Sequence, residues 1–260
     1  MAKTLTGMAP QREQRLTELM VERLSQSVEP KLRKEIRRAM LAYADSYNND
    51  IKTAQAQQDH STAITAILTP MWSRAFTTFG RRMLEGYKRY DPREAVKSVD
   101  VYEQAFRRFL AVYGARKVTQ IIGTTQSQAI KLITAAIDEA QQEGLGEIET
   151  AKVVLRNVRS QAGVLSSFRA KMISRTESHS AAMTSNHTAA KATGLPLLKE
   201  WVASRSERTR PDHEEANGQR VKIDDSFIVG GEYLLMPGDP SGSAEQIINC
   251  RCAQIYVLPD

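Results

Sequence analysis

Two cysteines separated by a single residue, Cys250 and Cys252, are the part of this sequence best suited to chemistry. If they lie on a strand, their side chains point to the same face, and two thiolates placed in this way can bind one soft metal ion. A histidine in the same C-terminal region, His213, supplies a third ligand of the kind that zinc prefers. The sequence therefore offers His213, Cys250 and Cys252 as ligands of a structural zinc ion.

A second interpretation is that the two cysteines are buried thiols that bind no metal. A structural zinc ion normally has four protein ligands, and only three residues of suitable type are evident. Asp212 or a water molecule would have to complete the shell. Two cysteines in 260 residues also exclude a disulfide scaffold of the kind found in small secreted proteins. Buried thiols and structural zinc stay open as alternatives, and no other cofactor is indicated.

Sequence signatures of catalysis are missing. Gly242-Ser243 lacks the flanking pattern of a nucleophile elbow, and there is no glycine-rich phosphate-binding loop. His179 and His187 are eight residues apart on an expected helix. At about 1.5 Å per residue this spacing separates them by about 12 Å, too far to share one metal ion. His60 lies in an expected polar turn. We predict a protein that binds partners and is not an enzyme.

Charged and polar residues on both sides of the expected boundary between helix and sheet are a further candidate for a polar site. They are Arg175, Thr176 and Glu177 on the helix and Arg205, Glu207, Arg208 and Arg210 after it. Residues of mixed charge at such a boundary usually pair with one another. We interpret them as an ion-pair network that joins helix to sheet.

The elements that must position these residues begin with a long helical region. From Pro10 to Ala192, apolar residues recur at spacings of three and four, as on one face of a helix. Interruptions of the helices are expected at Pro30, 55–60, Asp91-Pro92, Gly114, Gly123 and 144–146. After Gly123, Thr125 is expected to cap the next helix. After a short charged segment over 147–159, a last long helix is expected over 166–192.

After Pro196 the sequence changes to short β-type runs separated by turns. Strands are expected over 200–203, 220–223, 233–236 and 253–257, with tight turns at Asn217-Gly218, at Gly230-Gly231 and over 237–242. Because so short a region has few large apolar side chains, its core must be thin. We expect it to need the preceding helix or a metal ion for stability.

The fold class that follows is mainly α with a small α+β C-terminal module, in which long amphipathic helices precede a small antiparallel sheet. We divide the chain into an N-terminal helical region over 1–104, a second helical part over 105–194 and a small β-rich module over 195–260.

Charge is distributed unevenly along the chain. Residues 1–200 carry a net charge of +10 and residues 201–260 one of −4. A basic body attracts nucleic acid without sequence-specific contacts, although a solvated basic surface is the plainer explanation. No run reaches the roughly 20 apolar residues that span a bilayer, and residues 1–12 lack the apolar stretch of a secretory signal. We expect synthesis in the cytoplasm and no membrane partner.

Five blocks of sequence together resemble the Mu F-like phage head morphogenesis family. They are 173–177, 201–203 with 208–213, Asn217-Gly218, 237–240 and 248–252, within a match over roughly 105–257. Besides His213, Cys250 and Cys252, the residues that carry this signature are Arg175, Thr176, Glu177, Arg208, Asp212, Gly218 and Asn249. Residues 105–194 would then be the helical part of the Mu F-like domain.

The resemblance implies a minor head protein of a tailed bacteriophage, located in the virion head near the portal vertex. It would act in head morphogenesis, and in genome packaging or ejection. The implied partners are the portal protein, the major capsid or scaffold protein, and packaged DNA bound non-specifically. One alternative is a metal-dependent nuclease or hydrolase that uses His213, Asp212, Glu177 and the two cysteines. Another is a helical protein that binds nucleic acid non-specifically.

Overall fold

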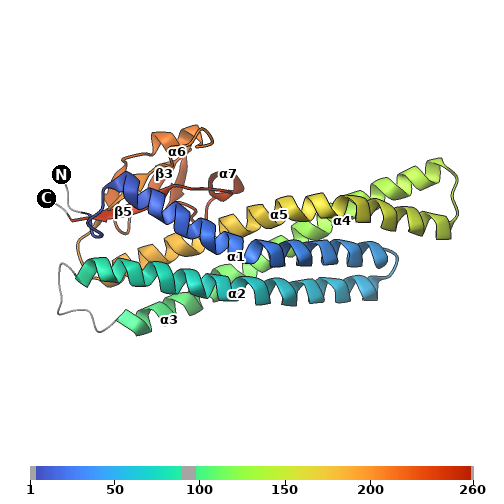
Figure 1. Ribbon diagram of the computed structural model, residues 1–260, viewed down its shortest axis with the longest axis horizontal. Coiled ribbons are helices and arrows are strands. Elements are labelled where there is room, and N and C mark those ends of the chain that lie inside the picture. The colour runs from blue at the N-terminus through green and yellow to red at the C-terminus, as the bar shows by residue number, and fades with distance from the viewer. Residues whose placement is uncertain (1–3, 89–97, 259–260) are drawn as a thin grey trace. The chain divides into compact units, whose positions relative to one another are not determined.

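The computed structural model describes residues 4–88 and 98–258, and it confirms the fold class (Figure 1). Long helices come first: α1 (Pro10–Asp45), α2 (Asp50–Lys88), α3 (Ser98–Phe109), the π-helical turn η1 (Leu110–Gly114), α4 (Ala115–Gln142) and α5 (Glu147–Ala192). Short elements follow: β1 (Leu198–Val202), α6 (Pro211–Glu215), β2 (Arg220–Lys222), β3 (Phe227–Val229), β4 (Glu232–Leu234), α7 (Ala244–Ile247) and β5 (Ala253–Val257). No helix within the described ranges has the length and apolar character needed to cross a membrane.

Two compact units share the long helices. The helical unit consists of residues 28–69 and 112–173, and the mixed unit of residues 1–27, 70–111 and 174–260. The division of the chain at residues 104 and 194 stays a prediction.

The helical unit is built from amphipathic segments of α1, α2, α4 and α5. Its buried side chains recur along each segment at helical spacing. Those that the sequence predicts are Leu32, Ile36, Met40 and Tyr43 in α1, Ile64 and Leu68 in α2, and Ile133 in α4. Further buried residues are Val118, Ile121 and Ile122 in α4 and Val154 and Val158 in α5. Hydrogen bonds between buried polar groups also join helices of this unit. Arg169 of α5 donates a hydrogen bond of 2.8 Å to Thr124 Oγ1 of α4.

Several of the helix interruptions that the sequence suggests are wrong. Pro30 lies inside α1. A proline inside a helix costs about 3 kcal/mol, but helix residues on both sides of it, such as Val28 and Leu32, bury their side chains and outweigh that cost. The polar stretch over 55–60 is also helical, because its polar residues cover the exposed side of α2 while Ala56 and His60 are buried. His60 is therefore a buried helix residue and not part of a turn.

The later helix boundaries are also corrected. The π-helical turn that ends at Gly114 leads directly into α4. Helix α4 continues through Gly123, where a side chain would meet open space, and the Thr125 hydroxyl donates to the carbonyl of Ile121 instead of capping a new helix. Helix α5 begins at Glu147, so the charged segment over 147–159 belongs to it. The expected stop at Asp91-Pro92 lies outside the described residues.

The mixed unit holds two small antiparallel sheets. One has the strand order β2-β1-β5, and the other is the hairpin of β3 and β4. The N-terminal segment extends the first sheet, since Thr4 forms a bridge with Val257 and the Leu5 amide donates to the carbonyl of Tyr256. Gly230 and Gly231 have φ angles of 56° and 79° in the β3–β4 turn, which confirms the expected turn at this pair.

Other details of the C-terminal region differ from expectation. Strand β1 begins two residues earlier than predicted, β4 ends at Leu234, and β3, α6 and α7 were not expected. The core is thin, as predicted. Large side chains in it include Trp201 and Phe227, whose rings meet edge to face at a centroid distance of 5.4 Å, together with Val229 and Leu234.

The C-terminal half of α5 is buried although it carries few large apolar residues. Small polar side chains fill it and bond to neighbouring backbone: Ser180 donates to the carbonyl of Gly238, and Ser185 to that of Phe76. Ser174 lies 2.8 Å from Ser25 of α1. Such small side chains let neighbouring elements approach α5 closely, which makes this helix the support of the C-terminal strands and loops.

Candidate metal centre

The histidine of the site lies on the short helix α6. Pro211 occupies its first turn, where the fixed φ of proline suits a helix and its missing amide hydrogen costs nothing. His213 is the third residue of α6 and is 1% exposed. Its ring stands edge-on to Trp201 of β1 with 5.4 Å between centroids. Asn217 and Gly218 then turn the chain into β2, with Gly218 at a φ of 80°, as the sequence predicts.

The two cysteines lie in an extended loop between α7 and β5, and the expectation that Cys250 belongs to a strand is wrong. The residue before them, Asn249, has a φ of 57°, a left-handed conformation that asparagine tolerates better than most residues. Its amide donates to Thr176 Oγ1 of α5 at 3.1 Å, which anchors the loop to that helix. Both cysteines are buried and neither forms a disulfide.

The structure brings the three predicted ligands together. His213 Nδ1 lies 3.4 Å from Cys252 Sγ and 3.7 Å from Cys250 Sγ. The three ligand atoms all lie within 4.8 Å of one another. The convergence predicted from sequence is therefore correct, although a loop and not a strand produces it.

A chain of hydrogen bonds fixes the orientation of the His213 ring. On the side away from the cysteines, Nε2 lies 2.9 Å from Gln246 Oε1. The Gln246 amide nitrogen donates to Asp212 Oδ2 at 3.0 Å, so the amide oxygen of Gln246 faces the ring. The ring must then donate from Nε2, which leaves the lone pair of neutral His213 on Nδ1. Sequence reasoning missed Gln246, since nothing about a glutamine in a polar loop marks it.

The two thiols are coupled electrostatically. The hydrogen bond from Cys250 lowers the pKa of Cys252 well below that of an ordinary thiol, and His213 and the backbone amide of Ser204 act in the same direction. The same bond, together with burial, raises the pKa of Cys250.

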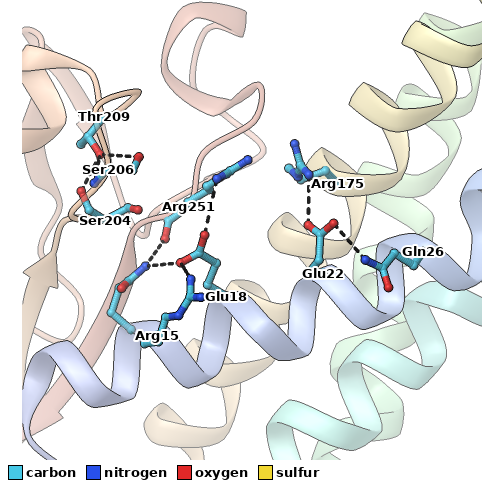
Figure 2. Close-up of polar contacts among 10 residues, drawn as sticks. Arg15, Glu18, Glu22, Gln26, Arg175, Ser204, Ser206, Thr209 and Arg251 are labelled. Carbon is cyan, nitrogen blue, oxygen red and sulfur yellow. Dashed lines mark hydrogen bonds and ion pairs between the residues drawn. The ribbon is translucent and has the colours of Figure 1, made fainter.

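A cavity of about 260 Å³ borders the three residues and is rich in arginine. Its charged lining residues are Arg175, Arg208, Arg210 and Arg251. Two of these reach helix α1, as Figure 2 shows: Arg175 donates to Glu22 at 3.0 Å, and Arg251 lies 3.5 Å from Glu18. Burial acts to raise the pKa of Glu22, but the hydrogen bond and charge of Arg175 outweigh it and lower that pKa.

These contacts change the interpretation of the charged residues around the boundary between helix and sheet. The carboxylate partner of Arg175 belongs to α1 and not to the sheet. Arg210 donates to the carbonyl of Ile248, a backbone group before the cysteines. Glu177 is a buried residue of α5. The contributions of Glu18 and Glu22 were not foreseen, because nothing local in the sequence links α1 to residues more than 150 positions away.

Comparison with known proteins places this arrangement in a family. Residues 131–255 match the family described as "Phage Mu protein F like protein". The chain is also 27% identical over 275 aligned positions to the minor head protein GP7 of Bacillus phage SPP1, an alignment that covers 98% of this chain and 85% of GP7. This chain contains a Mu F-like region. The match begins inside α4 and ends in β5, so the Mu F-like region includes all three clustered residues and the whole of α5.

A second, shorter similarity involves an enzyme. Over 69 residues the chain is 35% identical to the NAD(+)–arginine ADP-ribosyltransferase EFV of Enterococcus faecalis. That stretch covers 26% of this Mu F-like chain and 14% of the transferase. No solved structure matches the chain.

Proposed function

We propose that this Mu F-like protein is a minor head component of a tailed bacteriophage and acts in head morphogenesis. The observation that carries the proposal is the extent of the alignment with GP7, which covers 98% of this chain and 85% of that minor head protein. It therefore includes the helical unit as well as the Mu F-like region. A similarity of this extent favours a shared role of the whole chain over the reuse of one small domain.

A metal-dependent nuclease is less well supported. Such an enzyme needs an acid or base beside its metal. Among the described residues, the group of converging ligand atoms contains His213, Cys250 and Cys252 but not Asp212 or Glu177. The Asp212 carboxylate accepts a hydrogen bond from Gln246. The similarity to the transferase covers too little of that enzyme to carry its activity over.

We further propose that the protein lies near the portal vertex, in contact with the portal protein or the capsid or scaffold protein, and close to packaged DNA. The helical unit offers a surface suited to such contacts. A groove in it is lined by Arg33, Lys34 and Arg37 of α1 and by Val164 and Phe168 of α5. The two apolar side chains are 75% and 67% exposed. Basic and apolar groups side by side fit an acidic protein surface, and the basic groups also tolerate nearby DNA.

Quantitative mass spectrometry of purified phage particles tests the proposal. We expect a few copies of this chain per particle, far fewer than of the major capsid protein, in both filled and empty heads. A non-structural phage protein of similar abundance in infected cells serves as the control for carry-over. Absence of the chain from purified particles would overturn the proposal.

A cross-linking experiment on the same particles tests the finer placement. Cross-links from lysines of this chain to the portal protein are expected, and cross-links to major capsid protein far from the vertex would contradict the portal location.

For the enzyme alternative, purified protein is incubated with DNA. Cleavage that disappears in a His213→Ala variant would favour the nuclease.

A further inference from the structure

We propose that His213, Cys250 and Cys252 bind one divalent metal ion of the zinc class, and that its fourth coordination position opens into the arginine-lined cavity. The proposal concerns the interior of the mixed unit and does not depend on the role of the chain in phage heads.

The spacing of the ligand atoms is the first argument. In a tetrahedral zinc site with bonds of about 2.0 to 2.3 Å, neighbouring nitrogen and sulfur ligands lie about 3.5 Å apart. The distances from His213 Nδ1 to the two sulfur atoms are 3.4 and 3.7 Å. An ion can therefore enter between the three residues with little movement of the chain.

The orientation of the histidine is the second argument. Gln246, itself held by Asp212, faces Nε2 with its oxygen, so Nδ1 carries the lone pair that a metal needs. Histidine ligands of zinc commonly donate their second N–H to such an outer partner, which fixes the ring. Because Gln246 and Asp212 are engaged at the Nε2 edge of the ring, Asp212 is a supporting residue, and of the two fourth ligands that the sequence left open, Asp212 or water, it is the less suitable.

The burial of the three residues is the third argument. His213, Cys250 and Cys252 are 1%, 2% and 1% exposed, so little bulk water competes with a metal ion for their ligand atoms.

The fourth position follows from what surrounds the cluster. Within the described ranges, the group of potential ligands ends at three, and the cavity beside it is lined by arginine, serine and threonine side chains. None of these is a usual zinc ligand. Water or a small anion must then complete the shell, and Arg208 and Arg210 stand in the same cavity to favour an anion.

Metal titration of the full-length chain tests the proposal. Protein stripped with a chelator should bind close to one zinc ion per chain, and cobalt should give the thiolate-to-metal absorption of a four-coordinate site. Cys252→Ser and His213→Asn should lose that absorption. His187→Gln, which removes a buried histidine outside the cluster, should keep it.

The ligand variants could lose metal binding simply because they fail to fold. A further variant therefore keeps all three ligands and changes only Gln246. Gln246→Ala should weaken metal affinity by about 10- to 100-fold, the usual effect of removing an outer partner. Adding azide should change the cobalt spectrum if the fourth position is open. Failure of wild-type protein to bind zinc or cobalt would overturn the site, as would unchanged binding by Cys252→Ser. A spectrum that azide leaves unchanged would overturn the open position.

Discussion

The helical unit and the C-terminal module, residues 198–257, reach stability in different ways. Four long helix segments supply the helical unit with repeated apolar side chains, many of them fully buried. The C-terminal module has short strands and a small core in which Trp201 and Phe227 lie beside Cys250 and Cys252. Long helices can be stabilised by packing alone, whereas a short β-rich module gains more from an additional cross-link, which the proposed metal ion would supply.

Two buried histidines show the same difference at the level of single residues. In the helical unit, His60 Nδ1 lies 2.8 Å from Glu35, and Arg38 donates two hydrogen bonds to the same carboxylate. The Nδ1 atom of that histidine is thus engaged by a carboxylate that also pairs with an arginine. In the C-terminal module, His213 meets a neutral amide on one side and two sulfur atoms on the other. Only the second arrangement presents a set of metal ligands.

The largest effect is expected from the small core of the module. Trp201→Ala removes a fully buried ring that touches both Phe227 and His213, and it should lower the free energy of unfolding by about 3 to 5 kcal/mol. Urea denaturation followed by circular dichroism measures the change. Tyr233→Ala, at a side chain 73% exposed in the same module, should cost less than about 0.5 kcal/mol. Equal effects of the two substitutions would show that this core does not support the module.

Acid should weaken the mixed unit through its buried histidines. Burial, and then the charge of Lys199, lowers the pKa of His187 from 6.5 to about 4, and burial also lowers that of His179. Between pH 6.5 and 4 the unfolded chain binds more protons than the folded one, so stability is lost as the pH falls. For His187, a pKa shift of this size corresponds to a loss of about 3 kcal/mol in the free energy of unfolding. Denaturation at pH 7 and pH 5 should show the loss, and His187→Gln should reduce it. An unchanged pH dependence in that variant would refute the assignment.

A polar cluster of the helical unit should have a smaller effect. Glu35→Ala leaves His60 buried without its carboxylate and should cost about 1 to 3 kcal/mol. Glu103→Ala is the matched control, because the Glu103–Arg107 pair is largely exposed, and it should cost less than about 1 kcal/mol. Both values come from denaturation curves at pH 7. If Glu35→Ala cost no more than the control, the cluster would contribute nothing to the unit.

The smallest change in stability should come from substituting Gly230 or Gly231 in the β3–β4 turn. The two substitutions should differ in their effect on metal binding. Gly230→Ala and Gly231→Ala both force an alanine into a positive φ, at a cost of about 1 to 2 kcal/mol each. Only at Gly230 would the added carbon collide with Asp212 and Gln246, the pair that orients His213. Gly230→Ala should therefore weaken zinc affinity and Gly231→Ala should not, as isothermal titration can measure. Equal affinities would show that the pair does not support the site.

Sequence periodicity predicted much of the fold, including the break at 144–146 and the helix end at 192, but it also predicted interruptions that the structure does not have. The apolar faces of the long helices and the tight turns at Asn217-Gly218 and Gly230-Gly231 were predicted correctly, because local spacing and backbone preferences determine them. The interruptions predicted at Pro30 and Gly123 are wrong, since burial of side chains on both sides outweighs the local cost of proline or glycine in a helix.

The candidate site shows a similar division. His213, Cys250 and Cys252 were identified by residue type. The partners Gln246, Glu18 and Glu22 depend on contacts between distant parts of the chain, which no local pattern records.

Hydrogen–deuterium exchange of the full-length protein, measured with and without a chelator, tests most directly the claim that the two regions are stabilised differently. We predict that removing metal accelerates exchange of backbone amides over 198–257 and leaves those over 28–69 and 112–173 protected. Zinc added back should restore the protection. Exchange that is unaffected by the chelator, or accelerated equally in both regions, would contradict the account.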